Sequence, residues 1–235
     1  MLKQLRQRLQ ALQKTAGIES DHGVLPLGIA PIDAALGGGL ARGALHEIAA
    51  ASEAHLAAAT GFALRLAAHG QARLLWLAED MAFSESGAPY GPGLDAFGLR
   101  PERLLTVAAA QRCDLLWAME EALRCRAVHA AIGELRHGEI GMVALRRLSL
   151  AAGESGALAL LLRSAPADDA STAATRWIVR AAPNARFAVD LVRNRRGLLG
   201  SWILKWSDSD EPFALATHAQ PVAAPALDRP HRKVA

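Results

Sequence analysis

Lysine is scarce in this chain of 235 residues. Its four lysines are Lys3, Lys14, Lys205 and Lys233, so none lies anywhere from Thr15 to Gly200. A phosphate loop needs a lysine ammonium against the β- and γ-phosphates of a nucleotide. The interior of this sequence has no lysine for that purpose, which argues against conventional ATP hydrolysis.

Cysteine is also rare, and long apolar runs are missing. Cys113 and Cys125 lie 12 residues apart, which matches no zinc pattern, and two cysteines make no disulfide framework. We expect two partly buried thiols. No apolar run reaches the roughly 18 residues that cross a bilayer, and the basic N-terminus lacks the apolar core of a secretory signal. The sequence therefore predicts a soluble, cytoplasmic protein with no membrane segment.

The composition is that of a globular protein with a real core. Hydrophobic residues make up 51% of the chain and charged residues 21%, as in ordinary folded domains. The length suits one sizeable domain with tails. The net charge of +3 permits a nucleic-acid partner without requiring one.

Short apolar runs alternate with helical patterns between residues 44 and 164. Nearly continuous apolar runs are typical of strands buried on both faces of a parallel sheet. The alternation predicts an α/β fold, with a mostly parallel sheet flanked by helices on both faces. The strand-like runs are GALHEIA (43–49), ARLLWLAED (72–80), AVHAAIGEL (127–135) and GALALLLRS (156–164), and the helical patterns cover 53–69, 112–126 and 139–152. Residues 84–94 are predicted to form a turn-rich loop.

Three further strands are predicted late in the chain. WIVR, RFAVDLVR and SWILKW follow a polar segment, and NRRGLLG separates the last two, which indicates an antiparallel hairpin. We therefore expect one α/β domain over residues 24–207. An amphipathic helix is predicted over 1–16, and a disordered basic tail over 220–235.

The N-terminal segment carries a leucine stripe. Leu2, Leu5, Leu9 and Leu12 have the 3-4-3 spacing of one helix face. Such a stripe needs a surface to cover it. Two hypotheses remain open here: the helix packs on its own domain, or it docks on another protein.

The segment EIAAASEAHLAAAT lies where a phosphate loop would be expected, between a strand and a helix. The pattern G-x-x-x-x-G-K-[ST] supplies backbone N–H groups, a lysine and a magnesium-binding hydroxyl. The corresponding positions hold Ala50, His55, Leu56 and Ala57. We expect a degenerate loop, no bound nucleotide or other cofactor, no metal site and no catalytic residues.

Two segments are candidate contact surfaces. Arg193, Arg195, Arg196 and Lys205 lie within 13 residues, beside Trp202 and Trp206. Such a group is either a solvated turn or a weak DNA-binding surface, in which the arginines neutralise phosphates and a tryptophan stacks on a base. The loop PYGPGLDAFGL holds Tyr90 and Phe97, which either pack into the core or dock on a protein partner.

The stretch LPLGIAPIDAALGGGLARGALHEI resembles the lead-in to the phosphate loop of RecA-type recombinases. More closely, residues 24–206 resemble the ImuA family, a group of RecA-like accessory proteins of a bacterial mutagenesis cassette. The motifs that carry this resemblance are PYGPGL followed by FGL and an Arg-Leu-Leu segment (89–105), GEL (133–135), RRLSLAA (146–152), LLLR (160–163), AATRW (173–177) and RNRRGLLGSW (193–202).

The resemblance implies a RecA-like core and a function in the SOS response, in error-prone translesion DNA synthesis. The partners it implies are an ImuB-like polymerase-related protein, a RecA-type recombinase and an error-prone replicative-type polymerase. It places Glu79 and Asp80 where RecA-type enzymes activate water, and Gly133, followed by Glu134, where a magnesium-binding Asp is expected. We expect these carboxylates to be solvated or paired with arginine.

The same resemblance places the polar segment 165–175 where RecA-type proteins carry a DNA-facing loop. This segment holds Asp168 and Asp169, with only Arg176 nearby, which is unfavourable for DNA. The leading hypothesis is thus a non-catalytic accessory protein acting through partners. The alternatives are a SulA-type inhibitor of cell division and a weakly nucleotide-dependent, recombinase-like enzyme.

Overall fold

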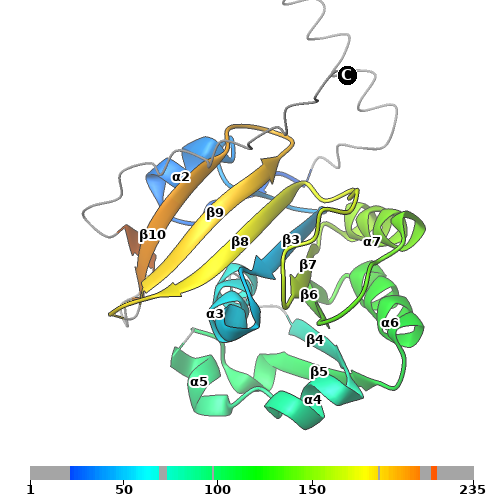
Figure 1. Cartoon of the computed structure of the whole chain (residues 1–235). Coiled ribbons are helices and arrows are strands. Elements are labelled where there is room, and N and C mark those ends of the chain that lie inside the picture. The colour runs from blue at the N-terminus through cyan, green and yellow to red at the C-terminus, as the bar shows by residue number, and fades with distance from the viewer. Residues whose placement is uncertain (1–21, 69–72, 97, 185, 207–212, 216–235) are drawn as a thin grey trace, which may run out of the picture.

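The computed structural model describes residues 22–68, 73–96, 98–184, 186–206 and 213–215. Its centre is a nine-stranded sheet in the order β11-β10-β9-β8-β3-β7-β6-β4-β5 (Figure 1). A separate two-stranded antiparallel ribbon is formed by β1 (Val24–Leu25) and β2 (Leu40–Ala41). The sheet strands are β3 (Leu45–Ala50), β4 (Arg73–Glu79), β5 (Leu104–Ala109), β6 (Val128–Leu135), β7 (Leu158–Arg163), β8 (Thr175–Ala182), β9 (Arg186–Asn194), β10 (Gly200–Trp206) and β11 (Phe213–Leu215).

Helices cover both faces of the parallel half of this sheet. Along β7, Leu158, Leu160 and Leu162 pack on one face with the α2 and α3 side chains, whereas Ala159 and Leu161 pack on the other with α6 and α7. This alternation explains why β7 is buried along its whole length. The helices are α2 (Ala30–Ala35), α3 (Leu56–Ala67), α4 (Asp80–Ser86), α5 (Gly91–Ala96), α6 (Arg112–Arg124) and α7 (Met142–Ser155), with 3-10 turns at Glu53–His55 and Pro101–Arg103.

The predicted α/β architecture is confirmed. Strands β8, β3, β7, β6, β4 and β5 pair in parallel, and β8, β9, β10 and β11 pair antiparallel. The hairpin predicted from WILKW and its preceding strand is β9–β10. In Figure 1 the face of β8, β9 and β10 that is turned toward the viewer carries no described helix, whereas α2 lies behind these strands.

An aromatic cluster joins the two halves of the sheet. Trp177 of β8 is fully buried, 5.4 Å from the Phe62 ring of α3 and 6.3 Å from Trp202 of β10, measured between ring centroids. Trp202 therefore packs against the core. Its side chain stays partly exposed, and stacking of a tryptophan on a base stays a prediction. The side chain of Trp206 lies outside the described residues.

Two local expectations are corrected. Residues 84–94 contain the end of α4 and the start of α5, rather than only a loop, since Pro92 takes a place in the first turn of a short helix, where its missing N–H costs nothing. Cys113 and Cys125 are exposed rather than partly buried, because they lie at the two ends of α6. The predicted segments 1–16 and 220–235 lie outside the described residues.

No helix in the described part of the chain is long and apolar enough to cross a membrane.

Candidate functional site

The loop between β3 and α3 occupies the position of a phosphate loop. It joins the carboxyl end of a central parallel strand to the first turn of a helix, which is where backbone N–H groups and the helix dipole favour an anion. Whether a phosphate could bind at this position depends on which N–H groups of the loop are free and on which side chains surround them.

The backbone of this loop is closed on the protein itself. The N–H of Ala51 donates to Val179 O at 2.9 Å, and the N–H of His55 donates to Ser52 O at 2.9 Å. The N–H of Leu56 donates to Glu53 O. The 3-10 turn thus takes up two N–H groups of the loop and strand β8 takes up a third, so none of the three is free to point at phosphate oxygens.

The side chains of the loop add nothing that would hold a phosphate. His55 Nδ1 accepts the N–H of Ala181 at 3.3 Å, and Leu56 packs, partly buried, against the core. Glu53 is exposed in the turn, so the loop carries a negative charge, while Leu56 occupies the position where a lysine would be required. The arrangement repels an anionic ligand.

The carboxylates at the same sheet edge are engaged by arginines. Glu134 is buried and accepts from Arg136 Nε at 2.8 Å and from Trp76 Nε1 at 3.2 Å. Glu79 lies 3.7 Å from Arg112 Nε. Both findings agree with the expectation of arginine pairing.

An aspartate at the position expected to bind magnesium would need the Met119 side chain to move. A Cβ on Gly133 would lie 2.7 Å from Met119 Sδ, which is closer than such atoms approach. Among the described residues, no group of three or more His, Cys, Asp or Glu side chains could hold a metal ion.

The connection between β7 and β8, residues 164–174, is fixed by a buried charge network rather than open to DNA. Arg176 Nε lies 2.7 Å from Glu47 Oε2, and its other nitrogens donate to the carbonyls of Ala167 at 2.7 Å and Asp169 at 3.0 Å. Asp169 also pairs with Arg163 at 3.2 Å. Arg163 and Arg176 therefore neutralise internal carboxylates and are not free for phosphates.

The tip of the β9–β10 hairpin, residues 194–199, is anchored to the end of α2. Ala35 O accepts the N–H of Leu198 at 3.1 Å and the side-chain amide of Asn194 at 2.9 Å. Gly197 approaches so closely that a Cβ there would collide with Ala35 O. The tip is consequently a defined surface rather than a loose turn.

The three hairpin arginines are left without carboxylate partners. Among the described residues, no ion pair involves Arg193, Arg195 or Arg196, and the latter two side chains are exposed. Partial burial and the neighbouring Arg193 lower the pKa of Arg195. An anionic partner would relieve that repulsion.

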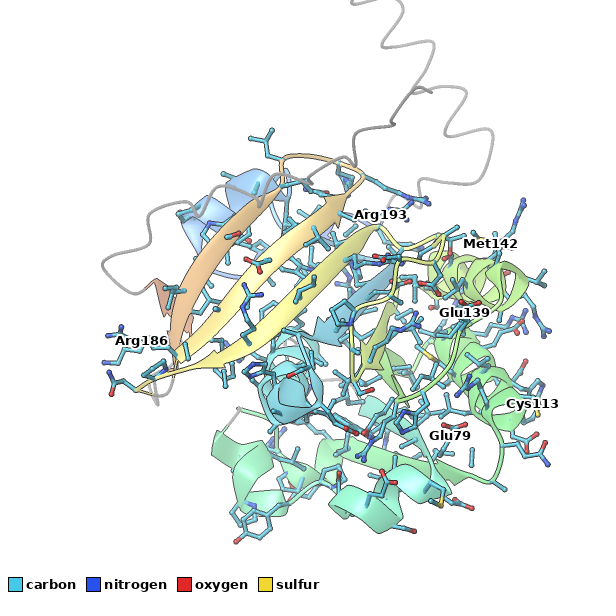
Figure 2. All side chains as sticks on the ribbon, in the orientation of Figure 1. Glu79, Cys113, Glu139, Met142, Arg186 and Arg193 are labelled. Carbon is cyan, nitrogen blue, oxygen red and sulfur yellow. The ribbon has the colours of Figure 1, made fainter. Side chains whose placement is uncertain are left out.

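Lys205 does not belong to this group. It pairs in register with Arg186 at the opposite end of the hairpin, and Arg186 and Arg193 lie at the two ends of β9 (Figure 2). Five residues of extended strand from Gly200 to Lys205 span about 17 Å. Lys205 lies close to the arginines along the chain, but the extended strand β10 separates it from them in space.

Of the remaining candidate contact residues, only Tyr90 lies within the part of the chain that the structure describes. Tyr90 is 74% exposed, so core packing is wrong for this residue, while docking on a partner stays a prediction. Phe97 and the leucines Leu2, Leu5, Leu9 and Leu12 lie outside the described residues. Sequence reasoning missed the exposed Leu198 and Leu199 beside the arginines, although both are visible in RNRRGLLG as apolar residues at a turn.

The arrangement of strands and helices is that of a RecA-like protein. The chain is similar to the RadB recombinase in its crystal structure, with a TM-score of 0.59 at 14% identity, over 79% of this chain and 97% of that one. This likeness defines the RecA-like fold.

Sequence comparison is more specific. The chain is 28% identical over 233 residues to each of two proteins named Protein ImuA, from Caulobacter vibrioides strains NA1000 / CB15N and ATCC 19089 / CIP 103742 / CB 15. The alignment covers 86% of this chain and 92% of theirs. The resemblance to the ImuA family is thereby confirmed. No family model matches the chain.

Proposed function

We propose that this chain is a non-catalytic, RecA-like accessory protein of an ImuA/ImuB-type mutagenesis cassette, acting in the cytoplasm in SOS-induced translesion DNA synthesis. The observation that carries the non-catalytic part is the closed phosphate loop, in which the N–H groups of Ala51, His55 and Leu56 are consumed internally. The cassette is supported by the likeness to the two ImuA proteins.

The proposed mode of action is binding of other proteins. The partners are an ImuB-like polymerase-related protein, a RecA-type recombinase and an error-prone replicative-type polymerase. A RecA-like fold without a phosphate cradle keeps its surfaces for docking, although it has lost the machinery for hydrolysis. This is the property expected of an adaptor.

Co-elution tests this function directly. The purified chain is mixed with each of the three candidate partners from the same genome and run on a size-exclusion column. At least one partner is expected to shift the chain to an earlier volume without nucleotide. Absence of any shift at tens of micromolar would contradict the adaptor role. A shift with a cell-division protein instead would favour the SulA-type alternative.

DNA contact by the hairpin is a second candidate activity, favoured by the three unpaired arginines. Binding is expected to be weak and indifferent to sequence, with a log–log salt slope on the order of −2 on single strands, because three phosphate contacts release about 0.7 ion each. Changing Arg193, Arg195 and Arg196 to Ala should flatten this slope, measured by fluorescence anisotropy with a dT oligonucleotide.

The matched control is the pair Arg186→Ala and Lys205→Ala, which removes two exposed cations from the other end of the same hairpin. It should leave the slope nearly unchanged. An equal loss with both variants would mean that overall charge, rather than the hairpin tip, determines binding. No binding at low salt would remove DNA from the proposal.

A further inference from the structure

The hairpin tip combines its arginines with exposed aliphatic side chains. Leu198 is 74% exposed, Leu199 is 60% exposed, and Val192 on β9 is 41% exposed. Leu191 pairs with Gly200, so the same register continued by one residue sets Val192 opposite Leu199. We call these three residues, with Arg193, Arg195 and Arg196, the tip patch.

The backbone beneath the tip patch is held in place before any partner arrives. Asn194 closes the turn, because its amide donates to Leu198 O at 3.0 Å while its oxygen accepts the N–H of Arg196 at 3.0 Å. The N–H of Arg195 donates to Ala174 O at 3.0 Å. A surface ordered in this way loses little backbone entropy on binding, which favours affinity.

The chemistry of the patch fits a protein better than a nucleic acid. Single-strand binding relies on aromatic rings that stack on bases, whereas the nearest ring, Trp202, packs against Trp177. Exposed leucines in the same turn as arginines instead fit a protein interface, where buried apolar side chains exclude water and arginine is enriched. Carboxylates on a partner would complement the positive charge of the patch.

We infer that the tip patch is a protein-docking site for an acidic segment that offers a small aliphatic pocket flanked by two or three carboxylates. Leu198 and Leu199 enter the pocket, while Arg195 and Arg196 pair with the carboxylates around it. The inference rests on the proposed adaptor function. It adds which surface of the chain binds a partner, and that the bound segment of the partner is acidic.

Photo-crosslinking through the tip tests the inference. The full chain carries p-benzoylphenylalanine in place of Leu198, and the control carries it in place of Met81, which is 67% exposed on α4. Both are irradiated with each co-eluting partner and with a dT oligonucleotide. We expect an adduct to a partner from position 198 alone, mapped by mass spectrometry to a segment with at least two Asp or Glu within about five residues.

Affinity measurements with the same partner separate the inference from the proposed function. Leu198→Ser with Leu199→Ser should weaken binding about tenfold or more, as loss of a central apolar anchor does. The triple arginine variant should weaken it and remove its salt dependence, whereas Arg186→Ala with Lys205→Ala should not. Circular dichroism should confirm that each variant is folded.

Several outcomes would overturn the inference. These are adducts only to the oligonucleotide, adducts only within this chain, no adduct from position 198, or a partner segment without acidic residues. Unchanged affinity of the leucine variant would also overturn it while leaving the adaptor function intact. If no partner co-elutes at all, the proposed function itself fails, which is a separate result.

Discussion

Replacing Arg176 with leucine is expected to lower the free energy of unfolding by about 3–5 kcal/mol, because removing one member of a buried ion pair leaves the other charge uncompensated. Glu47 is 1% exposed in the central strand β3, and its carboxylate accepts from Arg176 at 2.7 Å and from the Ser171 hydroxyl. The loss should appear as a lower midpoint in urea unfolding, with an unchanged slope.

Two further variants sharpen this test. Arg180→Ala breaks a pair with Asp190 in which the arginine side chain is 43% exposed, and such pairs contribute about 1 kcal/mol or less. The double variant Arg176→Leu with Glu47→Gln should recover part of the stability, since Glu47 is then no longer a buried carboxylate without its arginine. A loss below about 1 kcal/mol for Arg176→Leu would mean that the network does not hold residues 164–174 in place.

Lowering the pH from 7 to 4.5 is expected to cost about 2–3 kcal/mol of stability through His46 alone. This side chain is fully buried between Thr175 Oγ1 at 2.7 Å and Ala41 O at 2.8 Å. Desolvation by burial lowers its pKa from 6.5 to about 4, against a smaller opposing effect of the Ala41 hydrogen bond. The unfolded chain therefore binds the proton first.

The direction of the pH effect on stability follows from this difference in pKa between the unfolded and the folded chain. Above pH 6.5 the ring is neutral in both states and its contribution to stability is fully present. As the pH falls from 6.5 towards 4, only the unfolded chain gains the proton, so stability is lost. Urea unfolding of His46→Gln should show a flatter decline than the parent chain, while the exposed His137→Gln should keep the parental decline. Equal declines for all three would contradict the assignment.

The parallel core could be predicted from the sequence because its strands are continuous apolar runs separated by helical periodicity. β7 illustrates this: Leu158 to Leu162 is buried on both faces, as continuous apolar runs in parallel sheets are. The degenerate phosphate loop was equally visible, since Leu56 stands where a lysine is required. The sequence did not reveal the 3-10 turn and the contact with β8 that together take up the N–H groups of that loop.

Contacts between distant residues account for most of what sequence reasoning missed. The anchorage of the hairpin joins Leu198 to Ala35 through backbone atoms, which leave no mark in the sequence. Glu47 and Arg176 are 129 residues apart, and neither is unusual in its own segment. The grouping of Lys205 with the arginines was wrong because strand rise separates residues that lie near each other in the chain.

Titration calorimetry with a non-hydrolysable ATP analogue and magnesium most directly tests the central claim that this RecA-like chain acts without nucleotide. We predict no saturable heat, corresponding to a Kd of millimolar or weaker, and no phosphate release from ATP above the buffer rate. Leu56→Lys should not restore binding, because the N–H groups of Ala51, His55 and Leu56 stay bonded to β8 and within the 3-10 turn. A nucleotide-binding RecA-type recombinase in the same buffer serves as the positive control. Micromolar binding by the parent chain would contradict the claim.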